Sequence, residues 1–154
     1  EQASLADFTR QLLKKYDIPA NCLRFEVTEN GLMRDHQSAI DTMLSLSFLG
    51  VQLALDDFGT GYSSLKYLKE LPIDGIKIDR SFVQDIGIDS SDETIIDAML
   101  SMANSLGMYC IAEGVETEQQ LAFFRERHCY LIQGYLFGRP MPAEQMSEFL
   151  QQVL

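Results

Sequence analysis

The sequence predicts an α/β fold in which parallel strands alternate with helices. Short apolar runs typical of strands and segments with helical periodicity follow one another from end to end, and the connections between them are short. This alternation favours parallel strands joined by right-handed crossovers. The polar residues fit the same arrangement, because many lie at or just after the ends of the predicted strands, where parallel α/β folds build their sites.

The first half of the chain contains two helices and two strands. Apolar residues at helical spacing predict a first helix that ends before Ile18, because Pro19 disfavours helix in the residue that precedes it. The second helix ends at Gly50, which suits a left-handed cap. The predicted elements are, in order, a helix over 5–16, a strand over 22–27, a helix over 40–48 and a strand over 51–55.

Capping residues mark the helices of the second half. Ser63 or Ser64 can cap one helix, the Ser90 to Glu93 segment resembles a capping box, and Thr117 with Gln120 forms a second capping box. The predicted elements are a helix from 63 or 64 that ends before Pro72, a strand over 73–78, a helix over 95–106, a strand over 108–112, a helix that carries Leu121 and Phe124, a strand that begins at 131–132 and a terminal helix over 146–153.

Composition and charge narrow the classes of function. The 154 residues suit one domain, with 46% hydrophobic residues and 12 Lys and Arg against 23 Asp and Glu, a net charge of −11. This acidity argues against DNA, RNA or an anionic membrane as a partner and favours divalent cations. No apolar run reaches the length of a membrane span. Cys22, Cys110 and Cys129 form no CxxC motif, which fits a reducing, cytoplasmic location, although a parent protein could be anchored in a membrane.

Two architectures compete for this pattern. A five-stranded doubly wound sheet, as in phospho-receiver domains, also gathers aspartates and a lysine at strand ends. Such a domain needs its acidic pair near the start and its lysine on the last strand, whereas here Asp56 and Asp57 follow the second strand and Lys77 the third. The sequence therefore favours a TIM-like (β/α)8 barrel, of which about five βα units would be present at this length.

The strand ends carry a set of acidic and amide side chains and one lysine that would meet at one mouth. Such acids resist joint ionisation unless cations neutralise them, and oxygen ligands without suitable His or Cys favour Mg²⁺ or Mn²⁺. Two adjacent carboxylates can serve two ions, an arrangement that suits phosphoryl displacement. The residues are Glu26, Glu29, Asp56, Asp57, Lys77, Asp79, Glu113, Glu116 and Gln133.

Two features have both a structural and a functional interpretation. Lys77 lies between Ile76 and Ile78, so it faces the interior with Asp79, either in a structural ion pair or as a cation beside a phosphate. The Gly59-Thr60-Gly61 loop is either a turn or a place where the backbone approaches a phosphate.

Five motifs in this order resemble the EAL-domain family of bacterial cyclic di-GMP phosphodiesterases. They are Glu26-Val27-Thr28-Glu29, Asp56-Asp57-Phe58-Gly59-Thr60-Gly61-Tyr62-Ser63-Ser64-Leu65, Leu71-Pro72-Ile73-Asp74-Gly75-Ile76-Lys77-Ile78-Asp79, Ile111-Ala112-Glu113-Gly114-Val115-Glu116-Thr117 and Gln133-Gly134-Tyr135-Leu136-Phe137-Gly138-Arg139-Pro140. The resemblance covers essentially the whole chain. It implies a modified TIM barrel in which two Mg²⁺ or Mn²⁺ ions activate a water that opens cyclic di-GMP to linear pGpG.

The resemblance also implies roles for individual residues. Glu26, Asp56 and Asp57 would bind the metals, with Asp56 between the two. Lys77 would position the water and the attacked phosphate, Glu113 would act as the general base, and Gln133 would hydrogen-bond near them. Asp79 and Glu116 would lie close to the metals, Glu29 would anchor the loop that follows Asp57, and Gly59, Thr60 and Gly61 would form a substrate loop.

The chain departs from the family pattern at its start. The Glu-Ala-Leu motif with its following Arg-Trp is absent, and so is the metal-binding Asn of the next strand. We therefore expect residues 1–154 to be the C-terminal part of an EAL domain, nearly inactive alone and prone to form a homodimer or otherwise self-associate through exposed edges. A non-catalytic module that binds cyclic di-GMP or a protein is the alternative, and a phosphoryl-accepting receiver domain is a more distant one.

Overall fold

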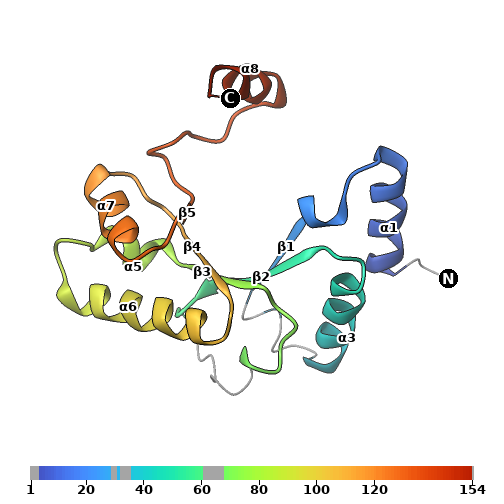
Figure 1. Ribbon diagram of the computed structural model, residues 1–154, viewed down its shortest axis with the longest axis horizontal. Helices are drawn as coiled ribbons and strands as arrows, with labels where there is room; N and C mark the ends of the chain where they lie inside the picture. Colours follow the sequence, from blue (N-terminus) through green and yellow to red (C-terminus); the bar gives the residue numbers. More distant parts are fainter. Residues whose placement is uncertain (1–3, 29–30, 32–35, 61–67, 154) are drawn as a thin grey trace.

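The computed structural model describes residues 4–28, 31, 36–60 and 68–153. Within these residues the chain forms one five-stranded parallel sheet flanked by helices (Figure 1). The elements are α1 (Leu5–Tyr16), the 3-10 helix η1 (Ala20–Cys22), β1 (Arg24–Thr28), α3 (His36–Ser47), β2 (Gln52–Phe58), β3 (Gly75–Ile78), α5 (Arg80–Gln84), α6 (Ser90–Ser105), β4 (Tyr109–Ala112), α7 (Glu118–Glu126), β5 (Leu131–Ile132) and α8 (Ala143–Val153).

The strands lie in the sheet in the order in which they occur in the chain. Each strand pairs in parallel with the next, from β1 through β5, and the order never reverses. A doubly wound sheet contains a switch point at which the strand order reverses, whereas a (β/α)8 barrel proceeds in sequence around its circumference. The predicted α/β class is therefore confirmed, and the strand order is that of part of a TIM-like barrel.

Side-chain alternation gives the two faces of this sheet different characters. Ile76 and Ile78 are fully buried on the face that packs against the helices, together with Leu53 and Leu55. The intervening Lys77 points to the opposite face, because successive residues of a strand alternate. The apolar core thus lies between sheet and helices, and the polar chemistry lies on the other side of the sheet.

The helix ends are set largely by the capping residues of the sequence. Thr117 and Gln120 form the predicted capping box of α7. The cap of α6 is Asp89, whose side chain accepts a hydrogen bond from Ser91 N, so this helix begins one residue earlier than the predicted box implies. The helix α5, capped by Asp79, is a further element that the sequence did not predict. The helix predicted from Ser63 or Ser64 falls mostly outside the described residues.

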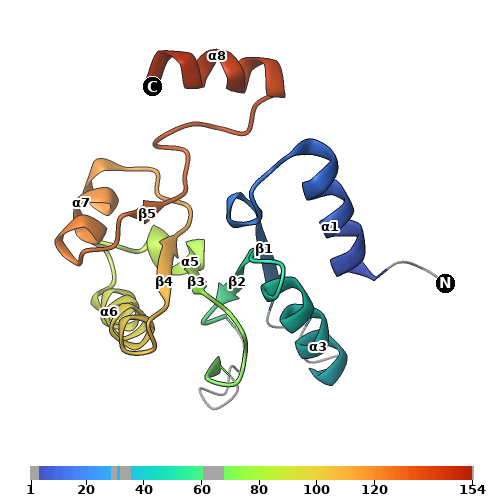
Figure 2. The ribbon, with the colours of Figure 1, turned by 45° about the vertical axis from the view of Figure 1, so that its right-hand side comes forward.

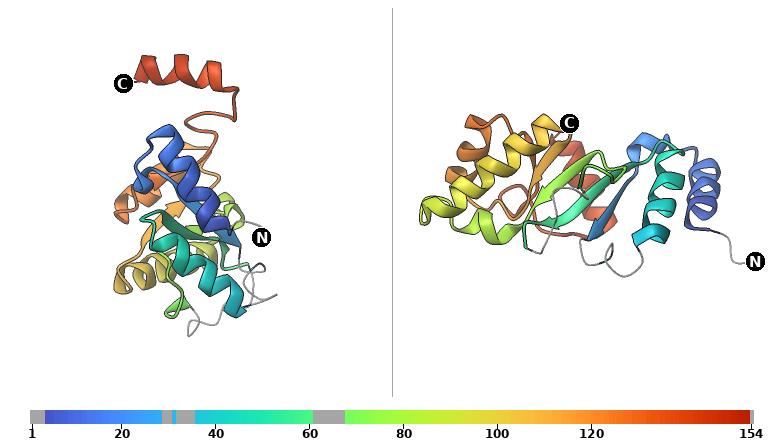
Figure 3. Two further views of the ribbon diagram at one scale, coloured as in Figure 1. Left: turned by 90° about the vertical axis from the view of Figure 1, so that its right-hand side faces the viewer. Right: turned by 90° about the horizontal axis from the view of Figure 1, so that it is seen from below.

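Figures 1 and 2 show α1 and α3 beyond β1 at one end of the sheet and α6 and α7 at the other. The helix α8 follows an extended segment and lies apart from the other helices in Figures 1 and 2 and in the left view of Figure 3, whereas it lies behind the sheet in the right view. Its side chains are exposed along residues 143–152. Among the described residues no helix is both long and apolar enough to cross a bilayer.

Candidate active site

Lys77 is the centre of an ion-pair cluster on the open face of the sheet. Its Nζ lies 2.6 Å from Glu26 Oε2, 2.9 Å from Asp56 Oδ1 and 2.6 Å from Glu113 Oε1. These carboxylates come from β1, from β2 and from the residue that follows β4, so the lysine links three separate strands. The Lys77 side chain is only 4% exposed, whereas that of Glu26 is 41% exposed. The ammonium group of Lys77 is therefore shielded from solvent, whereas the Glu26 carboxylate on β1 is partly accessible to it.

The surrounding carboxylates keep Lys77 charged. Burial alone lowers the pKa of a lysine, because the ammonium group loses its hydration. Contacts to Glu113, Glu26 and Asp56 outweigh this effect, and the pKa of Lys77 is raised above its ordinary value. The side chain is therefore a fixed positive charge, and it can hold anionic groups but cannot accept a proton at neutral pH.

A second, overlapping group consists of carboxylates alone. Oxygens of Asp56, Asp57 and Glu113 all lie within 4.8 Å of one another. Partial burial, together with the negative charges of Asp56 and Asp79, raises the pKa of Asp57. Burial also raises the pKa of Glu113, against the opposing effect of Lys77. The site therefore carries more negative charge than its lysine compensates.

This carboxylate group fits a divalent cation. Asp56 Oδ1 is buried and lies 2.9 Å from Lys77 Nζ, and no other described residue donates a hydrogen bond to it. A buried carboxylate oxygen of this kind, inside a cluster of like charges, is a favourable ligand for a hard cation such as Mg²⁺, Mn²⁺ or Ca²⁺. The donor set contains only oxygen, which does not favour zinc. The candidate ligands are Asp56, Asp57 and Glu113.

An irregularity of β2 brings the two adjacent aspartates into this cluster. The pairing with β3 runs from Leu55 opposite Ile76 to Phe58 opposite Ile78, so β2 contains one extra residue over this interval. Asp57 has a positive φ of 54°, an uncommon conformation for a residue other than glycine. Neighbouring side chains of a regular strand point to opposite faces. The bulge removes this restriction, and oxygens of both aspartates reach one cation-sized region.

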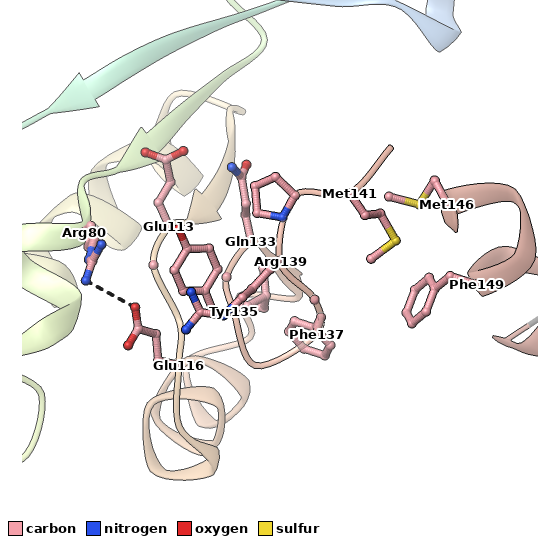
Figure 4. Close-up of a pocket in the computed structure, with 15 residues that line it drawn as sticks. Arg80, Glu113, Glu116, Gln133, Tyr135, Phe137, Arg139, Met141, Met146 and Phe149 are labelled. Carbon is pink, nitrogen blue, oxygen red and sulfur yellow. Dashed lines mark ion pairs between the residues drawn. The ribbon is translucent and has the colours of Figure 1, made fainter. Parts of the chain in front are cut away.

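A cavity of about 710 Å³ adjoins Glu113 (Figure 4). Glu113 and Gln133 point in the same direction from neighbouring strand ends, and both line the cavity. Arg139 lies over the ring of Tyr135, with the guanidinium carbon 4.3 Å from the ring centroid. The cavity therefore joins part of the acidic cluster to a wall of aromatic and cationic side chains.

Several predicted site residues are not among the three candidate ligands. Glu26 contacts Lys77 from β1, and it does not belong to the group of Asp56, Asp57 and Glu113. Asp79 caps α5 by accepting hydrogen bonds from Ser81, and Lys77 pairs with acids of other strands instead. Glu116 pairs with Arg80 at 3.2 Å.

The predicted substrate loop is described only in part. Gly59 and Thr60 form a turn directly after β2. Gly61 and Glu29 lie outside the described residues, so their predicted roles stay predictions.

The sequence did not single out the cavity wall. Arg80 directly follows Asp79 and pairs with Glu116, and Tyr135 and Arg139 lie in the last of the five motifs. The sequence does contain an indication of this wall. Large side chains recur at every second position, at Tyr135, Phe137 and Arg139, in a segment that forms neither a strand nor a helix. Alternation of this kind outside a strand could have indicated a binding wall.

Comparisons with known proteins place the chain in a family. The sequence profile of the EAL domain matches residues 1–140. The cyclic di-GMP phosphodiesterase NbdA of Pseudomonas aeruginosa is 50% identical over 150 residues, which cover 97% of this chain and 19% of NbdA. The chain therefore belongs to the EAL domain family.

Solved structures agree in fold. The MucR phosphodiesterase of Pseudomonas aeruginosa in complex with cyclic di-GMP has a TM-score of 0.86 and 44% identity, over 94% of this chain and 59% of that one. A complex of Klebsiella pneumoniae BlrP1 with manganese and cyclic di-GMP has a TM-score of 0.80 and 32% identity, over 86% of this chain and 34% of that one. The predicted resemblance to the EAL family is confirmed. The chain spans about three fifths of the solved MucR chain and about a fifth of NbdA.

Proposed function

We propose that this chain supplies the carboxylate and lysine machinery of a cyclic di-GMP phosphodiesterase, which hydrolyses cyclic di-GMP to linear pGpG. The observation that carries the proposal is the contact of one buried lysine with three carboxylates, two of which form a cation-sized group with a fourth carboxylate, Asp57. Relatives that include NbdA are named for this activity. Residues 1–154 would form part of the domain, since they span 59% of the solved MucR chain.

Two cations of the Mg²⁺ or Mn²⁺ type would be held by Asp56 and Asp57, with Glu113 and Glu26 adjacent. Such ions lower the pKa of water and neutralise charge on a phosphodiester. Lys77 would hold Asp56, Glu26 and Glu113 in place and present positive charge to a non-bridging phosphate oxygen. Glu113, whose pKa is raised by burial, would accept the proton of the attacking water.

The cavity beside Glu113 suits a flat, polar base. Tyr135 offers a ring face and Arg139 a planar donor group, a pairing that stacks well on nucleobases. Gln133 would bridge this wall and the acidic cluster through its amide. A guanine of cyclic di-GMP placed there would bring the linked phosphate toward Lys77.

Location and assembly complete the proposal. Cys22, Cys110 and Cys129 are all free thiols, which supports a cytoplasmic location. Exposed apolar residues of α1 and α8, among them Phe8 and Phe149, support self-association of the chain.

A chimera tests the catalytic proposal. This chain would replace the matching segment of the MucR phosphodiesterase, and conversion of cyclic di-GMP to pGpG would be followed by chromatography with Mn²⁺ present. We expect turnover in the chimera and almost none from residues 1–154 alone, because metal sites require complete ligand sets. Binding of cyclic di-GMP without turnover in the chimera would instead support a non-catalytic module.

A further inference from the structure

The turn that follows β2 has a strongly constrained backbone. Asp57 has a φ of 54° and Gly59 a φ of 98°. Thr60 closes the turn on Asp57, because its N and its Oγ1 both donate to Asp57 O, at 3.3 and 2.9 Å. The position of the Asp57 carboxylate therefore depends on how this whole turn is held.

Two side chains from distant parts of the chain lie against Gly59. A Cβ atom added to Gly59 would overlap Met99 Cε and would lie 3.0 Å from Phe82 Cε2. Met99 belongs to α6 and is 7% exposed, and Phe82 belongs to α5. The close approach requires glycine for its missing side chain as well as for its φ.

The same two side chains connect the turn to the strand of Lys77. The helix α5 begins directly after β3, where Asp79 caps it, and α6 packs against both α5 and β3. Phe82 and Met99 therefore connect two strands by packing. They link the turn after β2, the strand that carries the aspartates, to the helix that begins after β3, the strand that carries Lys77. No other element among the described residues supplies the atoms nearest to Gly59.

We propose that Met99 and Phe82 are positioning residues that hold Asp57 in the carboxylate cluster by fixing Gly59. Neither side chain would touch the cation or the substrate. The consequence for cation binding rests on the proposed function, whereas the effect on the turn does not.

The experiment compares Met99→Ala with Met102→Ala, the same truncation one turn further along α6, and with Met99→Leu as a conservative rescue. Hydrogen exchange of the Thr60 amide reports the turn, and exchange of the Ile76 and Ile78 amides reports global stability. In Met99→Ala we expect Thr60 exchange to rise about tenfold relative to those strand amides, with Met102→Ala and Met99→Leu close to wild type.

A titration with Mn²⁺ followed by electron paramagnetic resonance gives the second readout. We expect Met99→Ala to weaken Mn²⁺ binding at least about threefold, with no effect of Met102→Ala. Unchanged Thr60 exchange in Met99→Ala would overturn the proposal. If Met99→Ala fails to fold, Phe82→Leu takes its place under the same criteria. If residues 1–154 alone bind no Mn²⁺, the same variants are titrated in the MucR chimera, where the ligand set is complete. Absence of Mn²⁺ binding in the unmodified chimera would remove the support for the proposed function, and the exchange measurement still decides the role of Met99.

Discussion

Lys77 Nζ lies 2.6 Å from Glu26 on β1 and 2.6 Å from Glu113 after β4, two strands that are not neighbours in the sheet. One ammonium group therefore connects parts of the chain that share no backbone hydrogen bonds. The contact is electrostatic, and both the stability of the open sheet face and the chemistry of the site depend on it.

Lys77→Met should destabilise the chain and abolish turnover of the chimera. The substitution leaves three carboxylates together without a counterion. We expect a loss of about 1–3 kcal/mol, less than for a fully buried pair because Glu26 is partly exposed, measured by urea unfolding. The chimera should lose about 100-fold or more in kcat. Lys69→Met, at an exposed position, is the matched control, and an equal loss there would contradict the assignment.

Asp57→Asn should separate cation binding from stability. Asn tolerates a positive φ, and the change removes one charge from a group in which burial, together with the repulsion of neighbouring carboxylates, raises the pKa of Asp57. Without divalent cations we expect the free energy of unfolding to stay equal or rise by a few tenths of a kcal/mol, about the scale of an exposed charge. Mn²⁺ affinity should fall about tenfold or more in calorimetry. Asp41→Asn, on α3, serves as control for the loss of a charge and should leave Mn²⁺ affinity unchanged.

The three thiols should differ sharply in reactivity. Cys22 is exposed, whereas burial raises the pKa of Cys110 to about 12 and that of Cys129 to about 11. Since the thiolate is the reactive form, a thiol reagent at pH 8 should modify Cys22 quickly and the other two slowly, and Cys22→Ser should remove the fast phase. Rapid labelling of all three in the folded chain would contradict the burial.

These raised thiol pKa values also predict a loss of stability at alkaline pH. A group whose pKa is higher in the folded state stabilises the fold below its unfolded pKa, and this contribution is lost as pH rises through the folded value. For Cys129 the window runs from its ordinary value of 9.0 to about 11. Unfolding by urea across this range should show a smaller decline in Cys129→Ala than in the unmodified chain.

Gly134 should tolerate no side chain. A Cβ there would overlap the backbone carbonyl oxygen of Val115, which cannot move aside as a flexible side chain would. Gly134→Ala should destabilise the chain by about 1–3 kcal/mol and displace the adjacent Gln133. Gly138→Ala is the control, since its Cβ would meet only Met141 Cε at 3.7 Å. Similar melting temperatures for both variants would contradict the close approach.

The order and type of most elements could be predicted from the sequence because each depends on local patterns. The Thr117 and Gln120 box and the cap at Gly50 are such cases. The short helix α5 was not predicted, because five residues are too few to show helical periodicity. Strand bounds shifted by one to three residues, for example in β2, which extends to Phe58 because a bulge continues the ladder past the aspartates.

The candidate site was predictable in its residue types and not in its pairings. Alternation in β3 indicated that Lys77 faces inward, but its nearest acid in sequence, Asp79, caps a helix instead. The actual partners are 51 residues before it, 21 before it and 36 after it, and only the strand register brings them together. The left-handed conformation of Asp57 likewise follows from the bulge and leaves no mark in the sequence.

The bulge in β2 interrupts the regular strand pairing at the point where the two aspartates of the candidate site lie. Pairing with β1 continues to Asp56, while pairing with β3 gains one residue before it resumes at Phe58. The surplus backbone therefore coincides with the aspartate pair. Deleting one of these residues would give an uninterrupted hydrogen-bonded ladder, yet it would leave a single carboxylate facing the mouth. In this part of the fold, a change that made the strand pairing regular would therefore also remove the site.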